Sequence, residues 1–182
     1  MDRRNEVVEQ LRGTIMSVDP LQMEQLVQAI LGAREVFCHG IGRSGLSSRA
    51  FAMRLMHIGI PVSIVGDTLA HCIQKDDLLI LTSASGSSSS LYFIAKKAKD
   101  AGAKVALVTS TESSKIAEIA DHLLYLKAPS KYASYSAMKS ILPMGSLFEE
   151  GAYVLYDILV VELMERLKLT NDIVLKRHAN LE

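Results

Sequence analysis

One stretch decides the fold, and it reads Glu35-Val36-Phe37-Cys38-His39 followed by Gly40-Ile41-Gly42-Arg43-Ser44-Gly45. The first five residues form a short apolar run, which predicts a buried strand. The next six form a glycine-rich turn, and a helical pattern follows over about 46–57. A strand, a glycine turn and a helix in this order are typical of an α/β fold.

Four more apolar runs repeat this arrangement along the chain. Continuously apolar strands separated by helices indicate a parallel sheet that is covered on both faces. We therefore predict a doubly wound α/β fold with a five-stranded parallel sheet flanked by helices. The other four strands are expected at 61–65, 77–82, 104–109 and 122–126, with crossover helices over about 91–101 and 114–120.

Helices are also predicted at both ends of the chain. An apolar stripe runs from Val7 to Ile15, and a second helix is expected to begin at Asp19-Pro20, an N-cap residue followed by proline. A long, almost wholly apolar helix is expected over about 147–167. With 182 residues in all, we predict a single domain spanning residues 1–182.

Composition excludes several classes of protein. Hydrophobic residues make up 49% of the chain, which is enough for a full core and excludes a disordered protein. Lys plus Arg and Asp plus Glu number 20 each and aromatics only 5%, which argues against a nucleic-acid binder. The longest apolar stretch, 151–161, is about half the ~20 residues of a membrane span. We expect a soluble cytoplasmic protein without nucleic-acid or membrane partners.

The glycine turn is a candidate anion site. It lies where a doubly wound fold binds ligands, at a strand's carboxyl end and a helix N-terminus. Arg43 and Ser44 add a cation and a hydroxyl beside Gly42, which favours a sugar phosphate. Two alternatives stay open: a dinucleotide site, because the turn also matches G-x-G-x-x-G with Asp67 about 20 residues on, and a turn needed only for packing.

A second candidate phosphate loop follows the third predicted strand and reads Ser83-Ala84-Ser85-Gly86-Ser87-Ser88-Ser89-Ser90. Serine hydroxyls and loop N–H groups can bind the oxygens of a phosphate monoester. The alternative is a polar turn whose serines cap the next helix. No spacing of Cys and His residues predicts a metal site.

Two residues near the C-terminus are candidates for proton transfer. Glu149 lies at the start of the long apolar helix, where a partly buried carboxylate suits a general base. Equally, Ser146 and Glu149 match a capping box, S-x-x-E, so base and cap remain equal alternatives. His178 lies in a polar tail, and histidine is the side chain best suited to proton transfer near neutral pH.

The chain resembles the 6-phospho-3-hexuloisomerases, a family of SIS (sugar isomerase) domains with a flavodoxin-like fold. The resemblance runs through nearly the whole chain, and the late motifs are its most specific part. It rests on Gly40-Ile41-Gly42-Arg43-Ser44-Gly45-Leu46, Ala50-Phe51-Ala52-Met53-Arg54-Leu55-Met56-His57, Pro143-Met144-Gly145-Ser146-Leu147-Phe148-Glu149 and Arg177-His178-Ala179-Asn180-Leu181.

The resemblance implies interconversion of D-arabino-hex-3-ulose 6-phosphate and fructose 6-phosphate through a cis-enediol(ate), without metal or cofactor. It implies a homotetramer with Glu149 as base and His178 as acid/base partner, in its own or a neighbouring subunit's site. The phosphate-binding residues it implies are Ser44, Ser83, Ser85 and Ser88, with Gly42 and Arg43 close by.

Two loops depart from the usual pattern of that family, so the exact sugar stays open. The serine turn is one, and the other is the loop after the second strand, where Asp67 and Thr68 are expected to line the pocket. Two other functions therefore stay open: an isomerase for a different ketose or aldose phosphate, and a non-catalytic module that only binds a sugar phosphate.

Overall fold

A five-stranded sheet forms the centre of the computed structural model, which describes residues 2–129 and 139–181. Its spatial order is β2-β1-β3-β4-β5, and every neighbouring pair is parallel. This confirms the predicted fold class, because a parallel sheet in this order is that of the flavodoxin-like folds. The strands are β1 (Val36–Gly40), β2 (Val62–Ile64), β3 (Leu78–Thr82), β4 (Lys104–Thr109) and β5 (His122–Tyr125).

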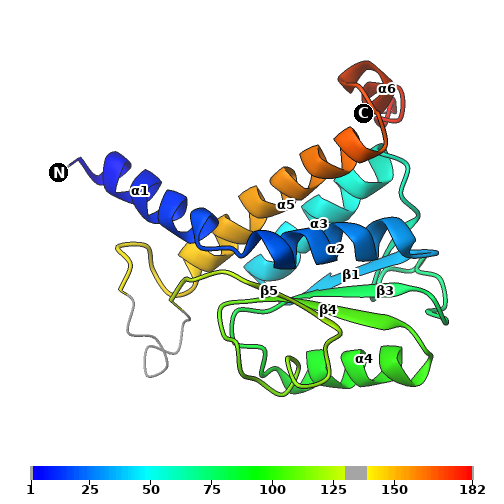
Figure 1. The fold of residues 1–182 in the computed structure, drawn as a ribbon, viewed down its shortest axis with the longest axis horizontal. Helices are drawn as coiled ribbons and strands as arrows, with labels where there is room; N and C mark the ends of the chain where they lie inside the picture. The colour runs from blue at the N-terminus through cyan, green and yellow to red at the C-terminus, as the bar shows by residue number, and fades with distance from the viewer. Residues whose placement is uncertain (1, 130–138, 182) are drawn as a thin grey trace.

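The helices form two layers around the sheet. Figure 1 shows α2, α3 and α5 on one side of the sheet and α4 on the other, while α1 extends beyond the sheet beside the start of α5. The terminal helix α6 lies past the C-terminal ends of α3 and α5 (Figure 1). The helices are α1 (Arg3–Met16), α2 (Pro20–Gly32), α3 (Arg43–His57), α4 (Ser89–Asp100), α5 (Ser146–Arg166) and α6 (Asn171–Leu175).

Alternating strand residues build a separate core on each face of the sheet. Val36 and Cys38 of β1 point into the core formed with α2, α3 and α5. Phe37, between them in the sequence, points into the core formed with α4. Because both faces are covered, the strands are apolar at almost every position, which explains the continuous runs in the sequence.

The sheet changes direction of winding between β1 and β3, and this places the candidate site. From β1 the chain turns through α3 to β2, and from β3 it turns through α4 to β4, on the opposite face. The loops that leave β1 and β3 therefore diverge at the carboxyl edge of the sheet, which is where doubly wound folds bind their ligands.

Two predicted helices differ from the structure. The helix expected over 114–120 is wrong: this segment forms isolated turns, with bonds such as Glu118 N–H to Ser114 O, between β4 and β5. Helix α3 begins at Arg43, earlier than predicted, because Gly42 adopts a φ of 62° and starts the helix there. The expected start of α2 is confirmed, with the Asp19 side chain accepting from Leu21 N–H.

None of the helices found in residues 2–129 and 139–181 combines the length and apolar character needed to span a membrane.

Candidate active site

The glycine turn brings the end of β1 against the first turn of α3. A methyl group on Gly45 would lie 2.5 Å from the carbonyl oxygen of Gly40, so the two backbones touch and only glycine fits. Arg43 and Ser44 are thus in the first turn of a helix rather than in a loop. The N–H groups of such a turn have no partner within the helix and favour an anion.

The serine turn lies beside the glycine turn, because Thr82 at the end of β3 pairs with Gly40 at the end of β1. A segment after β4 shapes it: the hydroxyls of Thr109 and Ser110 both donate to Ala84 O at 3.0 Å. No pattern in the sequence predicts these two bonds, since the segments they join are far apart along the chain. The two predicted phosphate loops are therefore brought together at one edge of the sheet.

The predicted phosphate-binding serines differ in how free their hydroxyls are. Ser83 is buried and accepts from the N–H of Gly86, so it holds the turn in shape. Ser85 and Ser88 are half-buried, and Ser88 is the N-cap residue of α4 with its hydroxyl bonded to Ser90 Oγ. Ser44 is buried at the start of α3. Ser85 and Ser88 are the better placed to meet a ligand.

Glu149 and Glu150, at the start of α5, both bond to Arg43 at the carboxyl edge of the sheet. Arg43 Nε donates to Glu149 Oε2 at 2.6 Å, and its Nη2 donates to Glu150 Oε1 at 2.7 Å. The hydrogen bond that Arg43 donates to Glu149 raises the pKa of the guanidinium above its ordinary value, so Arg43 stays cationic. Glu149 is 20% exposed, whereas Glu150 is 52% exposed. The expectation of a partly buried carboxylate is therefore met at Glu149.

The capping box is not what the structure shows. Gly145 is the N-cap residue of α5, Ser146 is already its first helical residue, and the Ser146 N–H donates to Pro143 O. The side chain of Glu149 accepts from Arg43 through Oε2. A contact with α3, across the fold, overrides the local capping signal.

The loop after β2 is tied to α3. Both oxygens of Asp67 accept from the two terminal nitrogens of Arg49, at 2.9 and 3.0 Å. Thr68 is exposed next to it. A dinucleotide-binding acid needs its oxygens for a ribose, so this pairing of Asp67 with Arg49 disfavours the dinucleotide alternative.

His178 lies at the other end of α3 from Glu149. Its ring stacks on that of His57, with the centroids 5.2 Å apart, and its Nδ1 lies 2.8 Å from Ala179 O. Next to it, Arg177 donates to His57 O and places its guanidinium against Gly59. Since a helix rises 1.5 Å per residue, His57 is roughly 20 Å along α3 from Arg43. Within one chain, the structure does not bring His178 and Glu149 together.

The family model of the SIS domain matches residues 29–150, which contain both turns and both acids of the pair. The chain belongs to the SIS-domain family. This confirms the predicted resemblance.

Relatives of this SIS protein are similar over nearly their full length. One from Bacillus subtilis (strain 168), named 3-hexulose-6-phosphate isomerase, is 37% identical over 97% of this chain and 96% of the relative. One of the same name from Methanocaldococcus jannaschii is 40% identical over 88% of this chain and 84% of the relative. A Methanococcus jannaschii crystal structure, from which the molecular function of 3-hexulose-6-phosphate isomerase was inferred, is 33% identical with a TM-score of 0.87, covering 100% of both chains.

The sequence analysis did not predict the buried contact between Thr82 and Tyr156, which lies next to the candidate site. The hydroxyls of Thr82 and Tyr156 share a hydrogen bond, and Tyr156 stacks on Phe51 of α3. Burial raises the pKa of the Tyr156 phenol, so it stays neutral. Tyr156 is seven residues after Glu149 on the same face of α5. The pair therefore fixes the first turns of α5 against the carboxyl edge of the sheet.

The same SIS protein offers no metal site in the part of the chain that the structure describes: no group of three or more His, Cys, Asp or Glu side chains is arranged to hold an ion.

Proposed function

We propose that this protein is a sugar-phosphate isomerase that interconverts D-arabino-hex-3-ulose 6-phosphate and fructose 6-phosphate. The observation that carries the proposal is the contact of Glu149 with Arg43, since it holds a half-buried carboxylate beside the first turn of α3. Support for isomerase activity comes from the full-length relatives named 3-hexulose-6-phosphate isomerase. We expect residues 1–182 to act as one cytoplasmic domain without metal or cofactor.

The phosphate is expected to bind between the two turns. The N–H groups at Gly42 and at the start of α3 point to the carboxyl edge of the sheet, as the first N–H groups of a helix do. The hydroxyls of Ser44, Ser85 and Ser88 would add donors, and Ser83 would fix the turn. Asp67 and Thr68 would contact the sugar only after a change in the loop, because Arg49 now holds Asp67.

The reaction needs one proton moved between adjacent carbons. Glu149 would remove the proton from C2 of the hex-3-ulose phosphate, which leaves an enediolate across C2 and C3. The same carboxyl group would return the proton to C3, while the hydroxyl proton of O2 passes to O3 and C2 becomes the carbonyl. A positioned base of this kind contributes about 100- to 10,000-fold.

His178 would move the proton between the two oxygens. Because it lies at the opposite end of α3 within one chain, we propose that it acts at the site of a neighbouring subunit. A homotetramer, expected from the resemblance, provides such neighbours. Symmetric assemblies repeat the same contact at every site, so each copy would both give and receive a histidine.

The test is solvent exchange on a panel of ketose phosphates in deuterated water, followed by NMR. The proposal predicts deuterium at C3 of fructose 6-phosphate, because the enediolate spans C2 and C3. Deuterium at C1 instead would indicate an aldose–ketose isomerase with another substrate. A thermal shift with fructose 6-phosphate but no exchange at C1, C2 or C3 would indicate the binding module and refute the enzyme.

A further inference from the structure

Arg43 joins the two halves of the site. Its backbone lies in the first turn of α3, where the phosphate is expected, while its side chain reaches the acids of α5. Two of its nitrogens are already bonded, Nε to Glu149 and Nη2 to Glu150. The guanidinium is thus committed to carboxylates and not directed as a free cation at the phosphate turns.

The bridging of two adjacent acids by one guanidinium is a specific arrangement. Neighbouring residues on a helix project about 100° apart, so one planar fork must lie between Glu149 and Glu150 to bond both. Charge-assisted bonds of this length are about twice as strong as neutral ones. Glu150, the more exposed acid, accepts from Nη2 and so holds the guanidinium in place. The Nε of the same guanidinium then holds Glu149, the less exposed acid.

We infer that Arg43 is a positioning residue for the base Glu149 and that Glu150 is its second anchor. This inference rests on the proposed function and changes one part of it, since the sequence assigned Arg43 to the phosphate. The phosphate is left to the backbone N–H groups and serine hydroxyls of the two turns. Arg43 instead fixes the direction in which the Glu149 carboxylate faces the sugar carbons.

Kinetics separate the two roles of Arg43. We expect Arg43→Gln to lower kcat about 100-fold, the typical cost of a displaced catalytic group, with KM and the Kd for inorganic phosphate unchanged. Ser85→Ala should have the opposite effect: phosphate binding, measured by calorimetry, should become weaker while kcat stays nearly unchanged. If Arg43→Gln loses as much phosphate affinity as Ser85→Ala and keeps its kcat at saturation, Arg43 is a phosphate ligand and the inference is wrong.

Glu150 provides the second test, with Asp157 as a matched control. Asp157 is an exposed acid two turns further along the same face of α5. Glu150→Gln should lower kcat about 10-fold, since the second bond of Arg43 loses its anionic acceptor, whereas Asp157→Asn should leave kcat unchanged. Equal kcat values for the two variants would overturn the role of Glu150.

Arg43→Lys asks whether charge alone is sufficient. Lysine keeps the charge but lacks the planar fork, so we expect it to recover only part of the kcat lost in Arg43→Gln. Full recovery would mean that no two-point hold is needed, which contradicts the positioning role.

A spectroscopic test does not depend on turnover. The ¹⁵N–¹H signal of Arg43 Nε, assigned by its loss in Arg43→Gln, should stay in place when inorganic phosphate saturates the wild-type protein. Movement of this signal on phosphate binding would show that the guanidinium transfers to the ligand. If the wild type exchanges no proton of any ketose phosphate, the isomerase proposal fails, while this signal and the phosphate affinities still decide the role of Arg43.

Discussion

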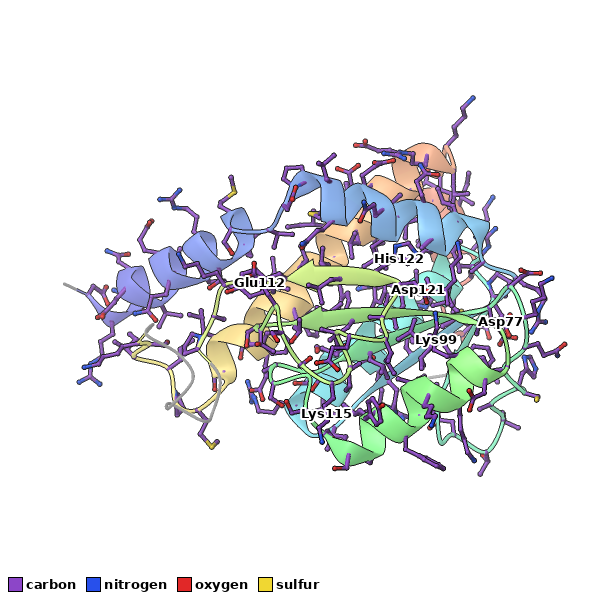
Figure 2. All side chains as sticks on the ribbon, turned by 60° about the horizontal axis from the view of Figure 1, so that its bottom comes forward. Asp77, Lys99, Glu112, Lys115, Asp121 and His122 are labelled. Carbon is purple, nitrogen blue, oxygen red and sulfur yellow. The ribbon has the colours of Figure 1, made fainter. Side chains whose placement is uncertain are left out.

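The two edges of the sheet carry different chemistry. At the carboxyl edge lie glycines, serine hydroxyls and the Arg43–Glu149 pair. At the amino edge lie His122, at the start of β5, and His57 with His178, at the end of α3. Figure 2 shows the same division, with Lys99, Asp121 and His122 grouped at the starts of the strands and Glu112 and Lys115 toward their ends.

Two pockets lie away from the glycine and serine turns. One pocket of about 270 Å³ is lined by residues that include Lys104 and His122, and one of about 250 Å³ by residues that include His57 and His178. Both lie at the amino edge, where the strands begin and α3 ends. The comparison shows that Glu149 and His178 lie at opposite edges of one chain, so a reaction that uses both side chains would need a second copy.

The largest expected effect is at the carboxyl edge. Glu149→Gln removes the proposed base but keeps its shape, so kcat should fall about 100- to 10,000-fold. Binding of fructose 6-phosphate, measured by calorimetry, should persist because the two turns are intact. Unchanged turnover would remove Glu149 from the mechanism and leave this edge as a phosphate-binding site only.

The next effect tests whether the two edges meet between subunits. His178→Asn should lower kcat by about 100-fold if the histidine transfers protons. The Glu149→Gln and His178→Asn proteins can then be mixed 1:1 and refolded together. Random assembly pairs an intact Glu149 with a neighbour's intact His178 at one site in four, so the mixture should recover about a quarter of the wild-type activity. No gain over the separate variants would place both residues in one chain's site or exclude His178.

A smaller effect is expected from the packing of the carboxyl edge. Gly45→Ala forces a methyl group to within 2.5 Å of Gly40 O, and overpacking of this kind costs about 1–3 kcal/mol in the free energy of unfolding. Gly13→Ala is the control, because a methyl group there meets nothing within 4 Å, and alanine in the interior of α1 should stabilise by about 0.5–1 kcal/mol. Urea denaturation measures both changes. Equal stabilities for the two variants would refute the close contact of β1 and α3.

The smallest effect concerns the amino edge. Burial, with Lys104 nearby, lowers the pKa of His122 in the folded protein below its ordinary 6.5. The unfolded chain then binds the proton more readily, so folded-state stability should decline as the pH falls below 6.5 toward the folded pKa. His122→Gln should remove this part of the decline in thermal melts taken across that range. An identical pH dependence would show that His122 titrates as an exposed residue.

The sheet could be predicted from the sequence, because buried parallel strands are apolar throughout and end at glycine or serine. Strand β4 has the predicted bounds, and the others differ by one or two residues. The helix predicted over 114–120 failed because its periodic apolar residues serve another purpose. Ile116 fills the core beneath α4, and its N–H bonds to Gly86 O in the serine turn.

The site could be predicted only in part. Both turns were found because each follows a strand directly. The partner of Glu149 was not, since Arg43 lies 106 positions earlier and only the fold brings the two together. The same holds for Thr82 and Tyr156, whose contact joins a strand end to a helix face. Local signals such as the S-x-x-E pattern at Ser146 gave way to these contacts.

The glycine that follows α3 has a consequence for the tail of the chain. Gly59 has a φ of 85°, and a methyl group there would lie 2.5 Å from Arg177 Nη1. Alanine rarely adopts this backbone conformation, so Gly59→Ala would strain the end of α3. It would also push the Arg177 guanidinium aside and loosen the segment that carries His178. Glycine at position 59 therefore serves two purposes at once, since it ends α3 and leaves room for the side chain that holds the tail of the chain in place.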